Sequence, residues 1–522
     1  MKKMSLFWNL CLFLLLLPLI GCTSSIDELE ARGDVNGLIE KLKSNDPMIC
    51  VEACSALKRI GEPAVDKLIL FFEGQKNDLA RKEVATTLGD IGDKRATEPL
   101  ISAVNVIDLS VRLAVIGALG NIKDKRASEP LVSKLNDADY RVRSLVVEAL
   151  GKIDGEKFAE HLIRALQDNS EEVRIAAIYS LERIDENLVV EPLILALKDE
   201  SEKVRIAAIY SLGNMEYVRN FAPLTVVSAL KDRSDNVRFA AAKALGNIND
   251  RRVIGPLTAA LNDVRDKVRL AAVNSLGNMD RPEVIKPLLS ALGNDDINVE
   301  IAAIEHLGNK DDERVIVPLI RALKSNDSIC DDRDNKAARA ALVKIGKPAV
   351  SHLIAEIKTQ SKLHLGVAGV LGEIGDQKDL LILEKYLVDW RLKKDIAEIL
   401  DSSAWRPNTT AEKIHFWVAA GKVDLIKENW ETAKEVLVKE LDSKNKALSQ
   451  YAAYALISLG QDDTVPILIH KLHKGRDLAL AKAYLNSGNE KLYESAERLA
   501  HLLDMEIHTT IHGTVPATWG SL

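Results

Sequence analysis

Seven arginines recur along the chain at intervals of 31 residues, with a single interval of 33. They are Arg81, Arg112, Arg143, Arg174, Arg205, Arg238 and Arg269. A row of guanidinium groups could bind a polyanion. It could instead form a structural ladder, in which each arginine bonds a loop carbonyl or an acidic residue of an adjacent unit. We favour the ladder, because five aspartates keep the same period: Asp137, Asp168, Asp199, Asp232 and Asp263.

One position of the repeat varies strongly in chemistry. Five residues after each arginine from Arg112 onward come Gly117, Glu148, Tyr179, Tyr210, Lys243 and Asn274. A position that stays fixed across an array carries packing, whereas one that varies this widely is expected to be exposed. Tyrosine is a favoured interface anchor, so the candidate binding residues are Glu148, Tyr179, Tyr210, Lys243 and Asn274. The alternative is that Tyr179 and Tyr210 only cover apolar surface around Ile175 and Ile206.

No set of residues has the spacing of a metal or cofactor site. Cys50 and Cys54 lie one helical turn apart, where buried packing is common and too few further ligands lie near for zinc. The stretch from Asp327 to Asp334 gathers four aspartates but lacks the glycine of a calcium loop. Lys336 stands where an EF-hand would place another ligand. We interpret this stretch as a solvated acidic loop, and we expect no metal and no cofactor.

Cys22 is the one residue for which a covalent modification is predicted. Lys2 and Lys3 precede an apolar run, Leu6 to Ile20, which is too short to span a membrane comfortably and is typical of a signal peptide. The run ends in Leu19-Ile20-Gly21-Cys22, which resembles the lipobox of prokaryotic lipoproteins. The resemblance implies cleavage before Cys22 and lipidation of its thiol. An uncleaved anchor with an incidental cysteine is the alternative.

The charge balance disfavours one class of partner. The chain has 70 basic and 77 acidic side chains. Nucleic-acid binding draws most of its affinity from neutralising phosphates, so we expect no nucleic-acid partner.

The elements that must position these residues are helices. Aromatic residues make up only 4% of the chain, and Ala, Leu, Lys and Glu favour helix because they lose little entropy there. In one repeat, Glu191-Pro192-Leu193 is predicted to open a first helix, since proline is tolerated in a first turn. Asp199 is predicted to close it. Ser201 is then expected to cap a second helix that begins near Glu202.

The second helix of this repeat has a buried stripe. Val204, Ala207, Ala208, Ser211 and Leu212 follow helical spacing, and the small Ala-Ala pair would let a neighbouring helix approach closely. Gly213 is predicted to end the helix in the left-handed conformation. The segment EEVRIAAIYSL, which begins at Glu171, returns 31 residues later as EKVRIAAIYSL. Each unit is therefore a helical hairpin that needs its neighbours to complete a core.

The pattern Pro-Leu, Asp, then Val-Arg-x-Ala-Ala-x-x-Leu-Gly resembles the short HEAT repeat named after the phycobilisome lyases. The resemblance implies an all-α fold, an α-solenoid of about eleven hairpins from Val35 to Gly375. HEAT-type iron hydroxylases carry His-Glu pairs, and none of the ten histidines of this chain is followed by glutamate. Metal-dependent hydroxylation is therefore disfavoured.

The predicted organisation has six parts. They are a signal peptide (1–21), a tether and N-terminal cap (22–33), the repeat array (34–375), an irregular Trp-rich helical segment (376–430), a further hairpin (431–475), and a C-terminal cap and tail (476–522). Atypical ends are expected, because the terminal units of a solenoid expose one face to solvent.

The functional hypothesis is a scaffold anchored to a membrane by lipid, on the extracytoplasmic side of the cell envelope. It would bind a protein or peptide along the concave face and would carry no catalytic residues of its own. The alternative is a bilin-lyase-like enzyme or an accessory subunit of one. Its pocket would then lie near Trp405, His415 and Trp417, or at His512 in the tail.

Overall fold

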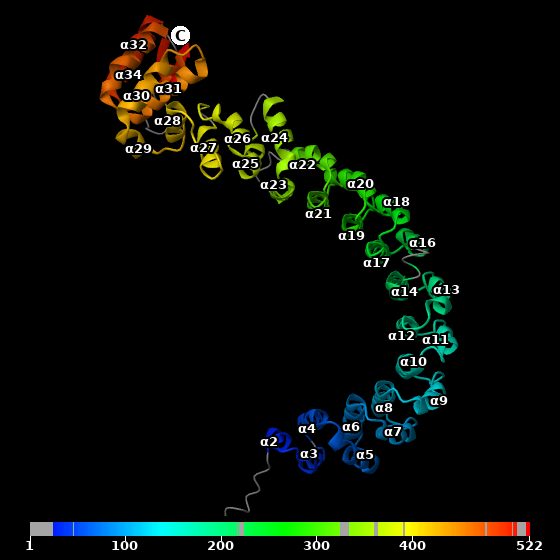
Figure 1. Ribbon diagram of the computed structural model, residues 1–522. Helices are drawn as coiled ribbons and strands as arrows, with labels where there is room; N and C mark the ends of the chain where they lie inside the picture. The colour runs from blue at the N-terminus through cyan, green and yellow to red at the C-terminus, as the bar shows by residue number, and fades with distance from the viewer. Residues whose placement is uncertain are drawn as a thin grey trace, which may run out of the picture. The chain divides into compact units, whose positions relative to one another are not determined.

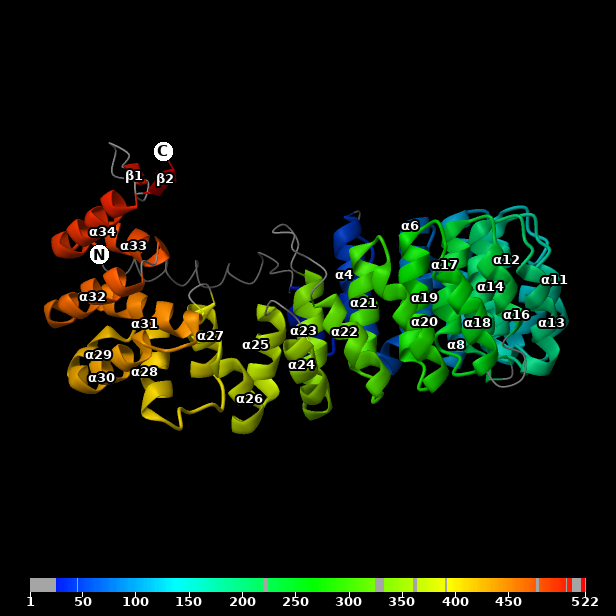
Figure 2. The same ribbon diagram turned by 90° about the horizontal axis from the view of Figure 1, so that it is seen from above.

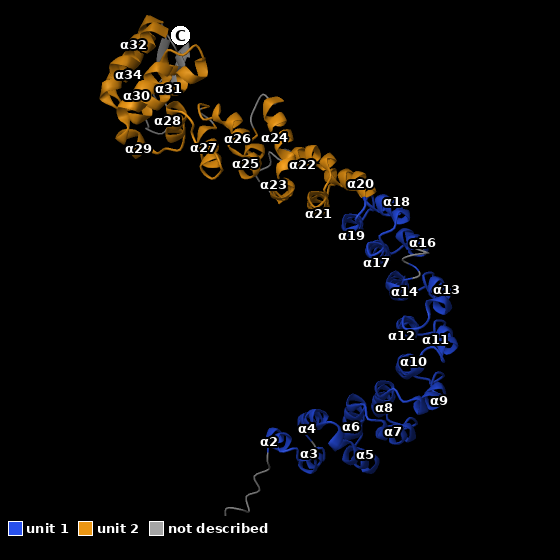
Figure 3. Ribbon diagram, viewed as in Figure 1, with its two compact units in different colours: residues 1–281 blue, residues 282–522 orange. Residues whose placement is uncertain are grey.

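The computed structural model describes residues 25–521 except 45, 217, 219–223, 324–332, 360–363, 390–391, 476–477, 504 and 509–517. The chain divides into two compact units, residues 1–281 (unit 1) and 282–522 (unit 2) (Figure 3). Both units are built from short helices that pair as hairpins and pack side by side. The predicted fold class, an all-α solenoid, is confirmed.

Unit 1 alternates first helices and second helices after α2 (Ile26–Ala31). The first helices are α3 (Val35–Lys41), α5 (Val65–Gly74), α7 (Thr97–Ser102), α9 (Ser128–Val132), α11 (Ala159–Ala165), α13 (Glu186–Ala196), α16 (Leu224–Val227) and α18 (Arg251–Ala260). The second helices are α4 (Pro47–Ile60), α6 (Asp78–Ile91), α8 (Leu109–Ile122), α10 (Tyr140–Asp154), α12 (Glu171–Leu181), α14 (Glu202–Asn214), α17 (Asp235–Leu245) and α19 (Asp266–Asn278). Within unit 1, the second helices line the inner side of a curved stack and the first helices the outer side (Figure 1).

The helices of unit 2 also pack side by side. Its helices are α20 (Ile285–Ser290), α21 (Ile297–Gly308), α22 (Ile316–Ala322), α23 (Arg333–Ile345), α24 (Lys347–Thr359), α25 (Leu365–Ile374), α26 (Gln377–Glu384), α27 (Lys393–Asp401), α28 (Thr410–Ala419), α29 (Val423–Glu428), α30 (Trp430–Leu441), α31 (Lys446–Leu459), α32 (Val465–Gly475), α33 (Leu478–Leu485) and α34 (Glu490–Leu502). The predicted limits at residues 375, 430 and 475 stay predictions.

Two further kinds of element connect or end the helices. The strands β1 (Met505–His508) and β2 (Thr518–Ser521) pair antiparallel next to α34 (Figure 2). The short 3-10 helices are η1 (Glu62–Ala64), η2 (Lys94–Ala96), η3 (Lys125–Ala127), η4 (Ser228–Lys231), η5 (Pro282–Val284), η6 (Ala291–Gly293), η7 (Glu313–Val315) and η8 (Asp462–Thr464).

The repeated glycine has a different role from the one predicted. Gly213 lies inside α14 with helical backbone, so the prediction of a left-handed helix end is wrong. A Cβ atom at Gly89 would lie 2.4 Å from the Cα of Ala118, and one at Gly120 would lie 2.9 Å from the Cβ of Ala149. Contacts below 3 Å do not fit between packed atoms. The glycine is therefore required because adjacent second helices approach each other closely at this point.

Three other local predictions for this repeat are wrong. Helix α13 begins at Glu186 and ends at Ala196, so Pro192 lies inside it and Asp199 lies beyond its end. The missing N–H of Pro192 leaves one helical hydrogen bond unmade. Ser201 precedes α14 but makes no capping bond. Its hydroxyl instead donates to the Glu171 carboxylate of the preceding second helix, 2.6 Å away, and so joins two units.

The periodic arginines connect consecutive units. Arg174 donates through Nε and Nη2 to the two carboxylate oxygens of Asp199, at 2.9 Å each, and through Nη1 to the carbonyl of Asp168 at 2.8 Å. The same arrangement joins Arg143 to Asp168, Arg205 to Asp232, and Arg238 to Asp263. We call these four pairs the ladder.

Each ladder aspartate also closes the turn in its own unit. The Asp168 carboxylate accepts a hydrogen bond from the backbone N–H of Ser170 at 2.8 Å. The carboxylates of Asp199, Asp232 and Asp263 likewise accept from the backbone N–H of the residue two positions later. Burial acts to raise the pKa of Asp168, but the hydrogen bonds from Arg143 and Ser170 outweigh it and hold that pKa below the usual range. A ladder carboxylate is thus bonded from two units at once.

The other three periodic arginines lie in different surroundings. Arg112 donates to the carbonyl of Val106 at 2.8 Å, and its Nε lies 3.9 Å from the Asp137 carboxylate. Arg81 lies over the Phe72 ring, 5.3 Å from its centroid. Arg269 donates to the carbonyl of Asp263 at 3.0 Å. The guanidinium groups therefore contact protein atoms at each described position of the row.

Replacement of Gly89 by alanine tests the close approach of second helices. We expect Gly89→Ala to lower the free energy of unfolding by about 1–3 kcal/mol, the usual cost of overpacking. Gly255→Ala is the matched control, because Gly255 lies within α18 with open space around it. That change should raise the free energy of unfolding by about 0.5–1 kcal/mol. Urea unfolding followed by circular dichroism measures both, and equal effects would contradict the packing role of Gly89.

Replacement of Arg205 tests the ladder. Its side chain is 4% exposed and that of Asp232 is 14% exposed, so Arg205→Ala leaves a carboxylate buried without its partner. We expect a loss of about 3–5 kcal/mol in the free energy of unfolding. The control is Arg252→Ala, which breaks the pair with Asp250, whose arginine is 42% exposed; the expected loss is below about 1 kcal/mol. The ladder has no special role if the two variants unfold at the same urea concentration.

Candidate functional site

The candidate binding residues lie on consecutive second helices of unit 1. Glu148 is on α10, Tyr179 on α12, Tyr210 on α14, Lys243 on α17 and Asn274 on α19. Tyr179 is 50% exposed, Lys243 and Asn274 are exposed, and Glu148 and Tyr210 are half-buried. Because these helices pack side by side (Figure 1), residues at the same turn form a row across the inner side of unit 1. We call this the variable row.

A second row runs beside it, one helical turn earlier. The residue that follows each periodic arginine is apolar and half-buried on most second helices: Leu113, Ile175, Ile206, Phe239 and Leu270. These side chains are partly exposed to solvent, so a partner could contact them, and they also cover the core. Together the two rows make a surface of apolar side chains bordered by residues whose charge and size change from helix to helix.

A hollow opens in this surface between α10 and α12. Its lining residues are Glu148, Gly151, Lys152, Ala176, Tyr179, Ser180 and Arg183. Gly151 and Ser180 are in close contact at one border of the hollow, since a Cβ atom at Gly151 would lie 2.8 Å from the Cβ of Ser180. Two of the candidate residues, Glu148 and Tyr179, therefore share one site. The other three candidates, Tyr210, Lys243 and Asn274, are not among its lining residues.

Sequence reasoning missed the two cations of this hollow. Lys152 and Arg183 stand nine residues after a periodic arginine, near or just beyond the C-terminal end of a second helix. The same position of the other units from α8 to α19 holds asparagine: Asn121, Asn214, Asn247 and Asn278. The change from asparagine to a basic residue on two adjacent helices was a visible signal. Burial raises the pKa of the neighbouring Glu182, whereas the charge of Arg183 acts to lower it.

A second set of arginine contacts was also missed. Arg126 donates to Asp124 at 2.6 Å, to Glu98 at 3.2 Å and to the carbonyl of Lys94 at 3.0 Å. Its hydrogen bonds lower the pKa of Asp124 to about 2, against the opposing effect of burial. The repeated letters Asp-Lys-Arg-Ala at 93–96 and 124–127 were the available signal. These groups join the loops of neighbouring units and are already bonded to protein atoms.

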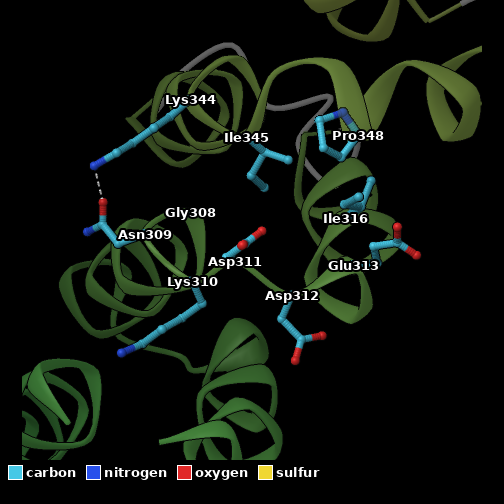
Figure 4. Close-up of a pocket in the computed structure, with 10 residues that line it drawn as sticks. All are labelled: Gly308, Asn309, Lys310, Asp311, Asp312, Glu313, Ile316, Lys344, Ile345 and Pro348. Atoms are coloured by element: carbon cyan, nitrogen blue, oxygen red, sulfur yellow. Dashed lines mark hydrogen bonds between the residues drawn. The ribbon is translucent and has the colours of Figure 1, made fainter. Parts of the chain in front are cut away.

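Unit 2 contains a separate hollow of about 270 Å³ between the loops that follow α21 and α23 (Figure 4). Its lining residues are Gly308, Asn309, Lys310, Asp311, Asp312, Glu313, Ile316, Lys344, Ile345 and Pro348. Lys344 donates to Asn309, and Asp312 accepts from the backbone and side chain of Arg314. None of these ten lining residues is a nucleophile paired with a base, so we assign no reaction to this hollow.

The aromatic residues proposed for an enzyme pocket are core residues. Trp405 is 2% exposed, and its indole N–H donates to the Glu384 carboxylate at 2.7 Å. Trp417 is buried as well. His415 lies 2.8 Å from Glu440, and the Tyr451 hydroxyl donates to the His415 carbonyl at 3.1 Å. The aromatic cluster stabilises the packing of α28, α30 and α31, and its residues line neither of the two hollows. His512 lies outside the described residues.

The remaining predicted positions have mixed outcomes. Cys50 and Cys54 are buried, and burial raises the pKa of Cys54 to about 12. Asp334 is 1% exposed within α23, so the prediction of a solvated loop is wrong for this residue; residues 327–332 and Cys22 lie outside the described residues. Among described residues, no group of three His, Cys, Asp or Glu side chains is placed to hold a metal ion. No described helix combines the length and apolarity needed to cross a membrane.

Comparison with protein families identifies the repeats. The family of HEAT repeats matches residues 108–182, 159–225, 190–269 and 256–342, and the PBS lyase HEAT-like repeat matches residues 80–105. A search of curated proteins found no match. The matched segments include the helices α8 to α19, which carry the ladder and the variable row.

Solved structures show limited similarity. The complex of CpcE and CpcF of phycocyanin lyase from Nostoc sp. PCC7120 is 27% identical, covers 28% of this chain and 98% of its own, and has a TM-score of 0.27. Human deoxyhypusine hydroxylase is 22% identical over 48% of this chain and 98% of its own, with a TM-score of 0.24. The karyopherin Kap121p, bound to the extreme C-terminus of the protein phosphatase Cdc14p, is 14% identical over 91% of this chain and 58% of its own, with a TM-score of 0.48. On the evidence of the family matches and its helical hairpins, the chain is a HEAT-repeat protein.

Proposed function

We propose that this protein is a scaffold that binds a protein partner on the second-helix surface of unit 1. The observation that carries the proposal is the variable row beside the half-buried apolar row. The array holds its packing residues nearly constant from unit to unit, yet it places a different side chain at almost every step of this one row. That combination is expected of a surface adapted to one partner.

The surface is large enough for a specific complex. Packed helices lie about 8–10 Å apart, so the six second helices from α8 to α19 span about 40–50 Å. Specific protein complexes bury about 800 Å² on each partner. At this width, about three to four helical turns of height supply such an area, which is the full length of second helices of 11–15 residues. Tyr179 and Tyr210 are the side chains best suited to anchor the partner, because tyrosine brings contact area and a hydroxyl at low entropic cost.

We further propose that the scaffold is tethered to a membrane through a lipid on Cys22, on the extracytoplasmic side of the cell envelope. The support is the order of features at the N-terminus: two lysines, an apolar run and the Leu-Ile-Gly-Cys sequence. A single acyl chain binds membranes weakly, and stable anchoring needs two or more. Lipidation of the kind found on prokaryotic lipoproteins would meet this requirement. The tether would leave the repeats free to meet a partner outside the cytoplasm.

The alternative of a bilin-lyase-like enzyme has less support. Trp405 and Trp417 are buried, and His415 is bonded to Glu440. These side chains would have to leave the core to contact a substrate, at a cost of several kcal/mol for a buried aromatic residue. The described side chains that suggested a catalytic pocket are thus accounted for by packing.

The tyrosines test the scaffold proposal. Crosslinking of the chain in its own envelope, followed by affinity capture and mass spectrometry, identifies the partner. The affinity of the purified partner is then measured for the double change Tyr179→Ala and Tyr210→Ala. We expect a loss of about tenfold or more, because interface tyrosines commonly contribute at least 1–2 kcal/mol.

The control for this experiment is Tyr493→Ala, which removes a half-buried tyrosine from α34 in unit 2. It should leave the affinity unchanged. If the partner's affinity is unchanged after replacement of both Tyr179 and Tyr210, the second-helix surface is not the binding site.

The anchor is tested by labelling cells with a palmitate analogue. We expect the full-length chain to carry the label and to fractionate with membranes, and Cys22→Ala to lose both properties, since the thiol is the only acceptor that the lipobox resemblance implies. Cys11→Ala, in the same N-terminal segment, should keep both. Label that persists in Cys22→Ala would rule out the proposed anchor.

A further inference from the structure

The hollow between α10 and α12 differs from the rest of the second-helix surface in its charge. Lys152 of α10 and Arg183, which follows α12, both line it, and Glu148 lies one helical turn before Lys152 on α10. Elsewhere along this surface from α8 to α19 the position of the two cations holds asparagine. The hollow therefore has two basic side chains and an exposed tyrosine among its lining residues.

Arg183 is available to bind a partner. It is exposed, and within the described residues it makes no hydrogen bond or ion pair. Burial raises the pKa of the adjacent Glu182, and the charge of Arg183 only partly opposes this rise. Lys152 makes a single long hydrogen bond, 3.4 Å from Nζ to Asn121. The arginines of the ladder, by contrast, donate to aspartates and carbonyls. Arg183 thus differs from them in being exposed and in making no hydrogen bond to another described residue.

The charges select the kind of group that fits. Two cations and the carboxylate of Glu148 leave one net positive charge in the hollow. A carboxylate would balance that charge, and arginine binds carboxylates with two parallel hydrogen bonds. A phosphate carries about −1.5 to −2 at neutral pH, which exceeds the available charge and would be repelled by Glu148. The Tyr179 ring forms one wall and would contact an apolar side chain next to the acid.

From this geometry we infer that the hollow binds an aspartate or glutamate of the protein partner. Its carboxylate lies between Arg183 and Lys152, and a neighbouring apolar residue packs on Tyr179. Glu148 is left to accept a hydrogen bond from the partner's backbone. The inference rests on the proposed function, because it names the chemistry of the segment that the second-helix surface would recognise.

A peptide library tests this inference even while the partner is unidentified. The purified full-length chain selects from random dodecapeptides displayed on phage. We expect the enriched peptides to share an acidic residue beside an apolar one. A synthetic copy of an enriched peptide should lose about ten- to hundredfold in affinity when its acid is replaced by the matching amide, the range for one charge-assisted hydrogen bond.

Variants of the chain locate the contact. The Arg183→Ala variant should bind the acidic peptide with an affinity lower by a similar factor. Its affinities for the acidic peptide and for the amide copy should be equal. Arg164→Ala is the matched control, since Arg164 is an exposed arginine on the first helix α11, and it should change neither value. Both sites are exposed, so the variants should fold as the parent does, which circular dichroism checks.

Three outcomes would overturn the inference. They are enriched peptides without an acidic residue, an acid-to-amide difference that persists in Arg183→Ala, and no enrichment of any peptide. Peptides that depend on Tyr179 but not on Arg183 would overturn only the carboxylate assignment. The scaffold proposal would then be tested separately, by the affinity of the purified partner for the chain with Tyr179→Ala and Tyr210→Ala.

Discussion

The close approach of adjacent second helices is the constraint on which the rest of unit 1 depends. A glycine on one helix faces an alanine or serine on the next, as at Gly89 with Ala118 and at Gly151 with Ser180. On α10, which carries Gly151, this approach places the Arg143 guanidinium within reach of a carboxylate in the next unit. With wider spacing there, the Nε and Nη2 atoms of Arg143 could not both bond Asp168.

The ladder in turn requires that spacing to stay constant. Burying a charged pair is unfavourable unless its hydrogen bonds are nearly all made. Arg205 makes them with both oxygens of Asp232 and with the carbonyls of Asp199 and Glu200. A shift of one unit against the next would break several of these bonds together. The ladder therefore favours a single register between units, whereas apolar packing alone would tolerate small shifts.

The sequence predicted the period, the helical hairpins and the pairing of four of the seven periodic arginines with aspartates, because each depends on residues that recur at one spacing. It did not predict the role of Gly213, since a left-handed helix end and a close helix contact both require glycine. It placed Trp405 in a possible pocket, because an aromatic cluster in a sequence is compatible with either a binding site or a core. The hollow beside Tyr179 could not be predicted from the sequence, since it depends on which residues of α10 and α12 face each other across the helix pair.

The arrangement of α10 and α12 explains how the array can carry a site without losing stability. The ladder arginine, the close-packed glycine and the variable-row residue are three different positions of each second helix, although the last two are neighbours in the hollow. A substitution at Tyr179 or Arg183 thus replaces neither a residue of a glycine contact nor a residue of the ladder. In repeat proteins, stability is close to a sum of local terms, so changes confined to the variable row leave the neighbouring units intact. Two adjacent hairpins can then acquire one cation each, in a chain of net charge −7, while the nearly identical segment 31 residues after Arg183 keeps an asparagine at Asn214.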